Sequence, residues 1–321
     1  MLNANNASLS VFLTAATSSL GRETTRQLVA RGHRVTGLTK GFDGAVMVRK
    51  DGGLPAYSDP YRAGEIKSII KMAAADVVIH VLPQEANVFP HKGLDWADSQ
   101  RLVDDSTAAL VDAASSAGTK FVVFLSSVAV YGDTHGEWVD ESAEAGDGEM
   151  AVMVTNAENK ILHGAFSAAV LRAGTLYGAY DSGMKFLSDA VMNGRAVYLG
   201  DNHTYRNWVH ESDLAKAAVL AAEQQPTGQI FNVTDDSPSH AADFITYLAT
   251  SMGLTTPAPL NPPAFALDRM TSAQQRDSMN TSLRVKTGKA KEQLGWSPRY
   301  ANFRSGIDQT LMMLRAEPVN P

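Results

Sequence analysis

The chain has 321 residues, of which 44% are hydrophobic and 19% are charged, a composition that is ordinary for a globular protein with a sizeable core. A formal net charge of −6 without a block of basic residues argues against nucleic-acid binding, and no apolar run reaches the ~18 residues of a membrane helix. Cysteine is absent, which excludes disulfides, thiolate catalysis and cysteine-ligated metal, and the N-terminus does not resemble a signal peptide, so we expect a cytoplasmic protein.

In chain order, short apolar runs alternate with segments whose apolar residues recur every three or four positions. Runs without alternating polar residues predict strands that are buried on both faces, and the alternation predicts a parallel, doubly wound sheet with right-handed crossovers. In the first half, the predicted strands are residues 11–15, 33–38, 75–83 and 120–127, and the predicted helices include residues 21–32 and 105–118.

The second half continues the sheet and adds a smaller lobe. Strands are predicted at 168–178 and 228–235, with a helix at 210–225, and the chain after about residue 237 is Pro-rich and helical, with a loop at 256–265. The expected fold class is α/β: a doubly wound, Rossmann-like parallel sheet with a small, mostly helical C-terminal substrate lobe. The predicted core is 1–170, completed by 171–178 and 205–235, and the predicted lobe is 179–204 with 236–321.

The turn after the first predicted strand reads TAATSSLG, residues 14–21. Dinucleotide-binding folds have glycines in this turn, because glycine permits a tight turn and lets the backbone approach the pyrophosphate. A helix N-terminus still offers N–H groups to an anion, and a positive φ at Ala15 would cost ~1 kcal/mol. The predicted cofactor residues of this turn are Ala15, Thr17, Ser18, Ser19, Leu20 and Gly21. A capped helix start without a cofactor is the alternative.

The end of the second predicted strand bears on the choice of cofactor. NAD enzymes place an acidic residue near this point to bind the ribose 2′-hydroxyl. Here the strand ends at Thr39 and Lys40, and the first acid is Asp43. A lysine beside a small hydroxyl suits a 2′-phosphate, so NADP(H) is favoured over NAD(H), although an exposed lysine at a strand end needs no such explanation.

Six segments further along carry a family resemblance. They are residues 126–132 (SSVAVYG), Lys160, 171–178 (LRAGTLYG), 206–215 (RNWVHESDLA), 231–238 (FNVTDDSP) and 294–300 (LGWSPRY). In this order they resemble the extended short-chain dehydrogenases/reductases, the NAD(P)-dependent epimerase/dehydratase superfamily, over residues 11 to about 300. Against the T-G-x-x-G-x-x-G form of that family, Ala15 and Ser18 replace two glycines and Gly21 remains.

The resemblance implies NAD(P) along the carboxyl edge of the sheet, beside Val81, and a substrate under the C-terminal lobe. Ser127 matches the family's catalytic serine, which bonds to the reacting carbonyl or hydroxyl. Lys160 matches the lysine that binds the nicotinamide ribose. Arg206 matches an arginine that often binds a substrate anion, and Tyr131 is assigned to the substrate with Ser127 and Arg206. The fold alone fixes little of the function.

The family's Tyr-x-x-x-Lys pair is incomplete, because Asn156 stands four positions before Lys160, the only lysine between Lys120 and Lys185. This spacing puts the two side chains on one helix face. An amide can position a substrate oxygen but cannot deliver and recover a proton. The predicted catalytic residues are therefore Ser127, Asn156 and Lys160, with an altered proton transfer.

Four interpretations remain. The favoured one is an NADP(H)-dependent oxidoreductase or epimerase-like enzyme with another proton carrier, of which Lys160 is the leading candidate; His163 is the second, and it is more simply a solvated or core helix residue. The others are a non-catalytic sensor of NADP(H) or of a metabolite, like NmrA-like proteins, a non-redox biosynthetic enzyme on this scaffold, and a degenerate structural subunit.

The substrate is expected to be a small carbonyl or hydroxyl metabolite. Ala173 and Gly174 weakly disfavour a nucleotide sugar, since many enzymes for such substrates carry a proline or an asparagine nearby. We expect no nucleic-acid partner, no membrane and no metal. By analogy with the family, the Ala-rich helix around 107–117 would allow a homodimer.

Overall fold

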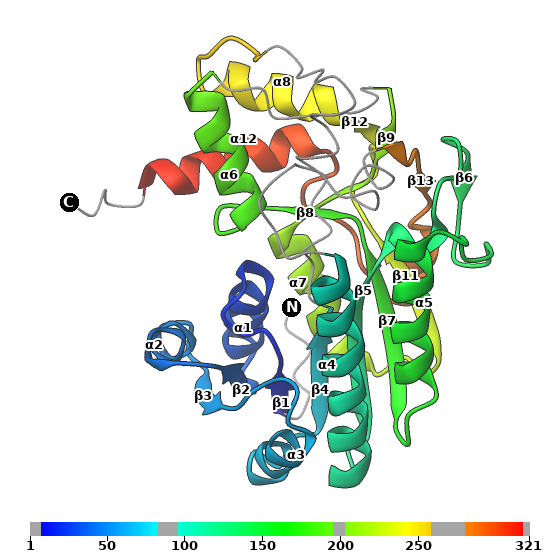
Figure 1. Cartoon of the computed structure of the whole chain (residues 1–321). Helices are drawn as coiled ribbons and strands as arrows, with labels where there is room; N and C mark the ends of the chain where they lie inside the picture. Colours follow the sequence, from blue (N-terminus) through cyan, green and yellow to red (C-terminus); the bar gives the residue numbers. More distant parts are fainter. Residues whose placement is uncertain (1–7, 83–95, 195–202, 258–279, 317–321) are drawn as a thin grey trace.

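The structure, a computed structural model, describes residues 8–82, 96–194, 203–257 and 280–316. Its main element is a sheet of seven strands, and every neighbouring pair is parallel (Figure 1). In spatial order the strands are β11 (Gln229–Val233), β7 (Ser167–Ala173), β5 (Phe121–Ser127), β4 (Val77–Val81), β1 (Ser10–Leu13), β2 (Arg34–Thr39) and β3 (Leu54–Tyr57). The order reverses at β1, which makes the carboxyl ends of β1 and β4 the switch point of the sheet.

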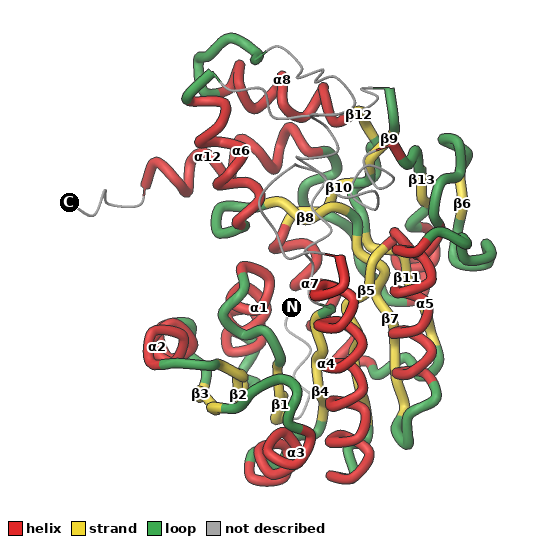
Figure 2. Tube along the Cα trace, in the orientation of Figure 1, coloured by secondary structure: helices red, strands yellow, loops and turns green. Residues whose placement is uncertain are grey.

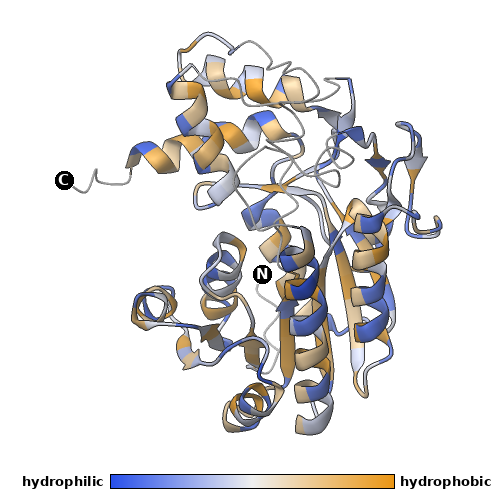
Figure 3. Ribbon diagram, viewed as in Figure 1, coloured by the Kyte–Doolittle hydropathy of each residue, from blue (hydrophilic) through white to orange (hydrophobic). Residues whose placement is uncertain are grey.

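Helices cover both faces of this sheet (Figure 2). One face is covered by α1 (Ser19–Ala30), α2 (Phe42–Lys50) and α7 (Glu211–Gln224), and the other by α3 (Ala63–Met72), α4 (Trp96–Ala117) and α5 (Glu149–Leu162). Strands β1, β4, β5 and β7 are almost wholly buried, as strands between two helix layers must be. The central strands are accordingly mostly apolar, whereas the helices are apolar on one side (Figure 3).

The second half of the chain builds a smaller group of helices beyond the carboxyl edge of the sheet. The helices are α6 (Ser182–Met192), α8 (Ala241–Ser251) and α12 (Phe303–Ala316), and they share a separate apolar cluster. The short elements around them are η1 (Val128–Tyr131), β6 (Trp138–Val139), β8 (Thr175–Tyr177), β9 (Tyr205–Arg206), β10 (Trp208–His210), β12 (Ser239–His240), β13 (Arg284–Val285) and α11 (Gly288–Gln293). Ala290, Leu294 and Trp296 instead join the core of the main sheet.

The predicted α/β fold with its doubly wound parallel sheet is confirmed. Two details differ. The strand predicted at 168–178 is divided at Gly174, where a Cβ would lie 2.6 Å from the carbonyl oxygen of Asn207, so that β7 stays in the main sheet and β8 pairs with β10. Residues 42–72, which the sequence left unassigned, form α2, β3 and α3. Most of the loop predicted at 256–265 lies outside the described residues.

No helix in the described ranges combines the length and the apolar character that a membrane span requires.

Candidate functional site

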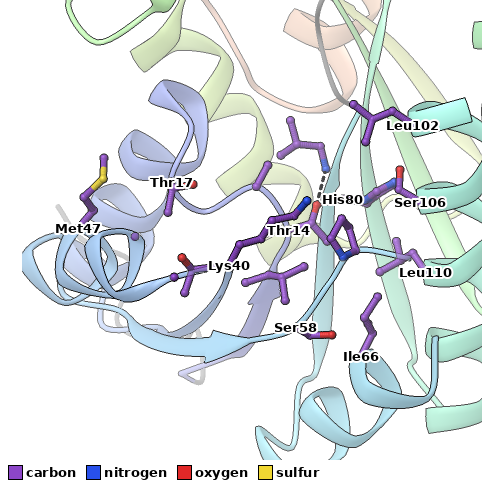
Figure 4. A pocket seen from close by; sticks show the side chains of 17 residues that line it. Thr14, Thr17, Lys40, Met47, Ser58, Ile66, His80, Leu102, Ser106 and Leu110 are labelled. Atoms are coloured by element: carbon purple, nitrogen blue, oxygen red, sulfur yellow. Dashed lines mark hydrogen bonds between the residues drawn. The ribbon is translucent and has the colours of Figure 1, made fainter. Parts of the chain in front are cut away.

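A cavity of about 540 Å³ opens at the carboxyl ends of β1, β2 and β4, at the switch point of the sheet. Ligands of open α/β sheets bind at this position. In Figure 4, Thr17, Lys40 and Met47 line one side of the cavity, and His80, Ser106 and Leu110 line the other. Five of the predicted cofactor residues belong to its wall, namely Ala15, Thr17, Thr39, Lys40 and Val81.

The turn between β1 and α1 retains the shape of a glycine-rich loop with a single glycine. Ala15 has a φ of 48°, in the left-handed region, where a side chain costs roughly 1–2 kcal/mol. Ser18 has a φ of −69° and needs no glycine. A Cβ at Gly21 would lie 2.1 Å from the carbonyl oxygen of Ala15, so this position does require glycine.

The hydroxyl of Ser18 is used within the protein. It donates to the carbonyl oxygen of Ala15 over 2.8 Å and accepts from the N–H of Gly21 over 3.0 Å, and so caps α1. Ser18 therefore shapes the loop through its side chain, and its predicted contact with the cofactor stays a prediction. Leu20 likewise lies in the core, while Ser19 is half-buried in the first turn of the helix.

The end of β2 and the start of α2 form the opposite side of the cavity. Lys40 is exposed, and its Nζ lies 5.8 Å from the centre of the Tyr61 ring. Thr39 is buried, and a Cβ at Gly44 would lie 2.0 Å from its Oγ1, so the helix can start this close to the strand only because residue 44 is glycine. None of the described residues that line the cavity is Asp or Glu.

Polar side chains that line the cavity without having been predicted include Thr14, His80 and Ser106. The hydroxyl of Thr14 accepts from the N–H of Val81 over 3.0 Å and lies 3.0 Å from Nδ1 of His80, whose Nε2 lies 3.4 Å from the hydroxyl of Thr107. Burial lowers the pKa of His80 to about 3, so the ring is neutral. Ser106 is 3% exposed, and among the described atoms its hydroxyl has no hydrogen-bond partner. The hydroxyl of Ser106 is thus available to a ligand.

Ser127, the predicted catalytic serine, lies at the carboxyl end of β5. Its Oγ accepts from the N–H of Ala129 over 3.1 Å and caps the short helix η1. The side chain is partly exposed, so it retains access to a molecule at this edge of the sheet.

Helix α5 is rotated so that Glu158 faces the sheet. The Glu158 carboxylate accepts from Oγ of Ser126 over 2.7 Å and pairs with Arg172 of β7, also over 2.7 Å. Residues four and eight positions before Glu158 lie on the same stripe of the helix. These are Val154, which is buried, and Met150, and both pack into the apolar cluster that contains Val128, Val130 and Tyr131, directly after Ser127.

Asn156 and Lys160 lie elsewhere on α5. A step of two positions turns roughly 200° around a helix, and Asn156 is accordingly exposed. Nζ of Lys160 donates to Oδ1 of Asp104 on α4 over 2.8 Å, with 37% and 32% of the two side chains exposed. Asn156 and Lys160 thus lie off the stripe that Glu158 turns toward the sheet, and the catalytic role of the pair stays a prediction.

The face of α5 nearest Ser127 therefore has apolar side chains at the spacing of the missing pair. Met150 and Val154 are separated by four positions, as the members of a Tyr-x-x-x-Lys motif are. Both belong to the apolar cluster that also contains the residues after Ser127, and this stripe has neither a phenol nor an amine at these two positions.

Tyr131 belongs to the buried network beneath this face. It is 4% exposed, and its hydroxyl donates to Oδ1 of Asn232 over 2.8 Å and accepts from Nη1 of Arg172 over 3.0 Å. Burial raises its pKa. The hydroxyl is thus engaged within the core, and the predicted substrate contact for Tyr131 stays a prediction.

Arg206 and His163, two further candidates from the sequence, hydrogen-bond to backbone carbonyl oxygens. Arg206 is 7% exposed, and its Nη1 donates to the carbonyl oxygen of Thr281 over 2.6 Å. Burial lowers its pKa to about 10, which leaves it charged at neutral pH, and its contact with a substrate anion stays a prediction. His163 is exposed at the C-terminal cap of α5, with Nδ1 2.8 Å from the carbonyl oxygen of Asn159.

Over the part of the chain that the structure describes, no three His, Asp or Glu side chains are grouped so that they could hold a metal ion.

Comparisons with known proteins agree with this architecture. The profile of the NAD dependent epimerase/dehydratase family matches residues 11–234. The chain is 28% identical over 310 residues to a 3-diazoavenalumate denitrifying reductase of a Streptomyces species, covering 92% of this chain and 98% of the relative. It is 26% identical over 257 residues to a 4-hydroxy-2-methyl-3-oxo-4-farnesyl-3,4-dihydroquinoline-1-oxide ketoreductase of Stigmatella aurantiaca, covering 76% and 73% of the two chains.

Solved structures with the same fold are more distant in sequence. MoeE5 in complex with UDP-glucose and NAD superposes with a TM-score of 0.78 at 21% identity, over 95% of this chain and 98% of the other. A UDP-glucose 4-epimerase of Thermotoga maritima gives a TM-score of 0.77 at 17% identity, over 95% and 98% of the chains.

Proposed function

The chain belongs to the NAD dependent epimerase/dehydratase family, and from that premise we propose that it is an NADP(H)-dependent reductase of a small metabolite. The observation that carries the proposal is the cavity at the switch point, which joins the α1 turn to Lys40 without a carboxylate among its described lining residues. When bound there, the reduced nicotinamide nucleotide supplies a hydride.

The residues around the cavity suit the two ends of such a cofactor. The start of α1 offers backbone N–H groups to a pyrophosphate, and the close approach at Gly21 keeps that helix end near the turn. Lys40 offers a cation to a 2′-phosphate, and no acidic side chain of the described wall would repel it. Ser106 offers a hydroxyl inside the cavity.

Two kinds of electrophile are candidates for the substrate. The Stigmatella relative is a ketoreductase and the Streptomyces relative is a denitrifying reductase of a diazo compound. A carbonyl or a diazo group on a small organic acid or polyketide-like molecule is therefore the proposed acceptor. In either case Ser127 would donate or accept a hydrogen bond at the reacting group.

Titration of the purified protein with NADPH and with NADH, followed by nucleotide fluorescence, tests the cofactor. We expect NADPH to bind about tenfold more tightly, since one charged contact to a phosphate contributes about 1.5 kcal/mol. Lys40→Ala should remove most of this preference and leave NADH binding unchanged. Lys50→Ala, an exposed lysine of α2 outside the cavity wall, is the matched control. Absence of binding to both nucleotides at millimolar concentration would refute the reductase.

A further inference from the structure

The stripe of α5 nearest Ser127 indicates what kind of acceptor the site can reduce. Building on the reductase proposed above, we propose that Met150 and Val154 face the nicotinamide end of the site, and that the substrate is an arenediazonium-type acceptor, which needs no proton from the protein when it takes a hydride. The stripe contributes only apolar side chains where an acid would have to be.

The rotation of α5 carries this assignment. Glu158 is 3% exposed and is fixed by four hydrogen bonds, one from Ser126 and three from Arg172. Helix α5 also contacts η1, which begins directly after Ser127, and the stripe of Glu158 continues, at the preceding turns of the helix, into the apolar cluster that contains η1. Val154 and Met150 occupy those turns. A rotation that brought Asn156 to Ser127 would expose a buried ion pair.

Among the described residues of α5 and of the elements around it, the side chains that could donate a proton already form hydrogen bonds or ion pairs within the protein. The Tyr131 hydroxyl donates to Asn232, and the Lys160 ammonium pairs with Asp104 on the flank toward α4. His163 hydrogen-bonds at the far end of α5. The neutral His80 lies in the cavity beside Thr14. Ser127 is then the described side chain near the turn after β5 that could still act as a general acid. An alcohol is a poor proton donor at neutral pH.

The chemistry of the two candidate acceptors differs in this respect. Reduction of an aldehyde forms a C–H bond and an alkoxide, which must take up one proton to become the alcohol. An arenediazonium cation that receives a hydride becomes an arene: a C–H bond forms, the C–N bond breaks, and its electron pair leaves with neutral N₂. The charges of hydride and cation cancel, so no proton enters. Apolar residues at positions 150 and 154 are compatible with the second reaction and unsuited to the first.

The experiment begins with the wild-type protein and two matched probes, benzenediazonium and benzaldehyde, each with NADPH deuterated at C4. Transfer of deuterium to benzene with release of N₂, in excess of the protein-free reaction and without a solvent isotope effect, is the expected result. Benzaldehyde should be reduced at least about 100-fold more slowly, the factor that a general acid typically contributes. Reduction of both probes at similar rates with a solvent isotope effect would overturn the inference and leave the reductase standing.

Variants test the orientation of the helix. Met150→Tyr with Val154→Lys should raise benzaldehyde reduction about 100-fold, while Asn156→Tyr, which pairs a new tyrosine with the existing Lys160, should not. A gain in Asn156→Tyr alone would overturn the inference. Because lysine at the buried position 154 could unfold the protein, Met150→Tyr by itself serves as the second variant, with folding checked by circular dichroism.

NADPH affinity gives a readout that is independent of turnover. Val154→Lys should tighten NADPH binding about fivefold, as expected for one added hydrogen bond of about 1 kcal/mol, whereas Asn156→Lys should leave it unchanged. Tighter binding in Asn156→Lys, or weaker binding in a folded Val154→Lys, would contradict the assignment of this face. A wild-type protein that binds NADPH but reduces neither probe would overturn the inference, whereas the reductase itself is refuted when neither nucleotide binds.

Discussion

Ala15 holds a backbone conformation that glycine adopts more easily, with a φ of 48°. Its side chain costs roughly 1–2 kcal/mol there, while glycine would lose about 0.5–1 kcal/mol through the entropy of the unfolded chain. Ala15→Gly should therefore stabilise the protein by up to about 1 kcal/mol in urea unfolding. Ala16→Gly, at a neighbouring buried residue outside the left-handed region, should destabilise it. Equal effects of the two changes would contradict this account.

The three positions of the α1 turn show why two glycines can be absent. Position 15 requires a positive φ, which alanine tolerates at a cost, and position 18 requires an N-cap, which serine provides. Of these three positions, only position 21 cannot accommodate a side chain, because a Cβ there would collide with the carbonyl oxygen of Ala15. The sequence alone shows the missing glycines, but the steric demand at each position depends on the distance between turn and helix.

At the scale of the elements, the buried strands and the long helices could be predicted, whereas β3 could not. Its pattern is weak because Leu54 and Tyr57 are exposed at the edge of the sheet. The rotation of α5 could not be predicted from the spacing of Asn156 and Lys160 either, since four residues put the pair on one helix face without saying which face meets the sheet.

A signal for the correct rotation was present in the sequence. Arg172 lies in the middle of an apolar run, and a charge in a buried strand requires a partner. Glu158 is the acid that shares a helical stripe with the apolar Val154 and Ile161. Pairing Arg172 with Glu158 would have turned Asn156 toward solvent. What the sequence could not provide is the Asp104–Lys160 contact, which depends on how α4 and α5 pack.

The two ion pairs of α5 should differ sharply in their contribution to stability. Glu158→Ala leaves Arg172 as an unpaired buried charge, which should lower the free energy of unfolding by about 3–5 kcal/mol. Lys160→Ala removes a pair with side chains 37% and 32% exposed, for which the loss should be less than about 1 kcal/mol. Thermal and urea unfolding of both variants measure the difference. Similar losses would mean that Lys160 is more deeply engaged than the structure indicates.

At the scale of the whole molecule, the sheet and the helical lobe have separate apolar clusters, and buried carboxylates lie where they meet. Glu211 begins α7 beside Gly178, and the backbone N–H of Asp235, after β11, donates to Trp208 of the lobe cluster. Burial is the main cause that raises the pKa of Glu211 to about 7 and that of Asp235 to about 8. Both groups hold a proton in the folded protein at a pH where the unfolded chain has released it.

This linkage makes the folded protein less stable as the pH rises. Below about 4.5, the ordinary pKa of a glutamic acid, Glu211 is protonated in both states. Between there and about pH 7 only the unfolded state loses the proton, so the free energy of unfolding falls by about 2–3 kcal/mol for this group. Glu211→Gln, which keeps the neutral shape, should flatten the decline of the unfolding midpoint between pH 5 and about 7.5, whereas Glu144→Gln at an exposed position should leave it unchanged. An unchanged slope in Glu211→Gln would show that Glu211 is ionised in the folded protein and that the junction between sheet and lobe admits water.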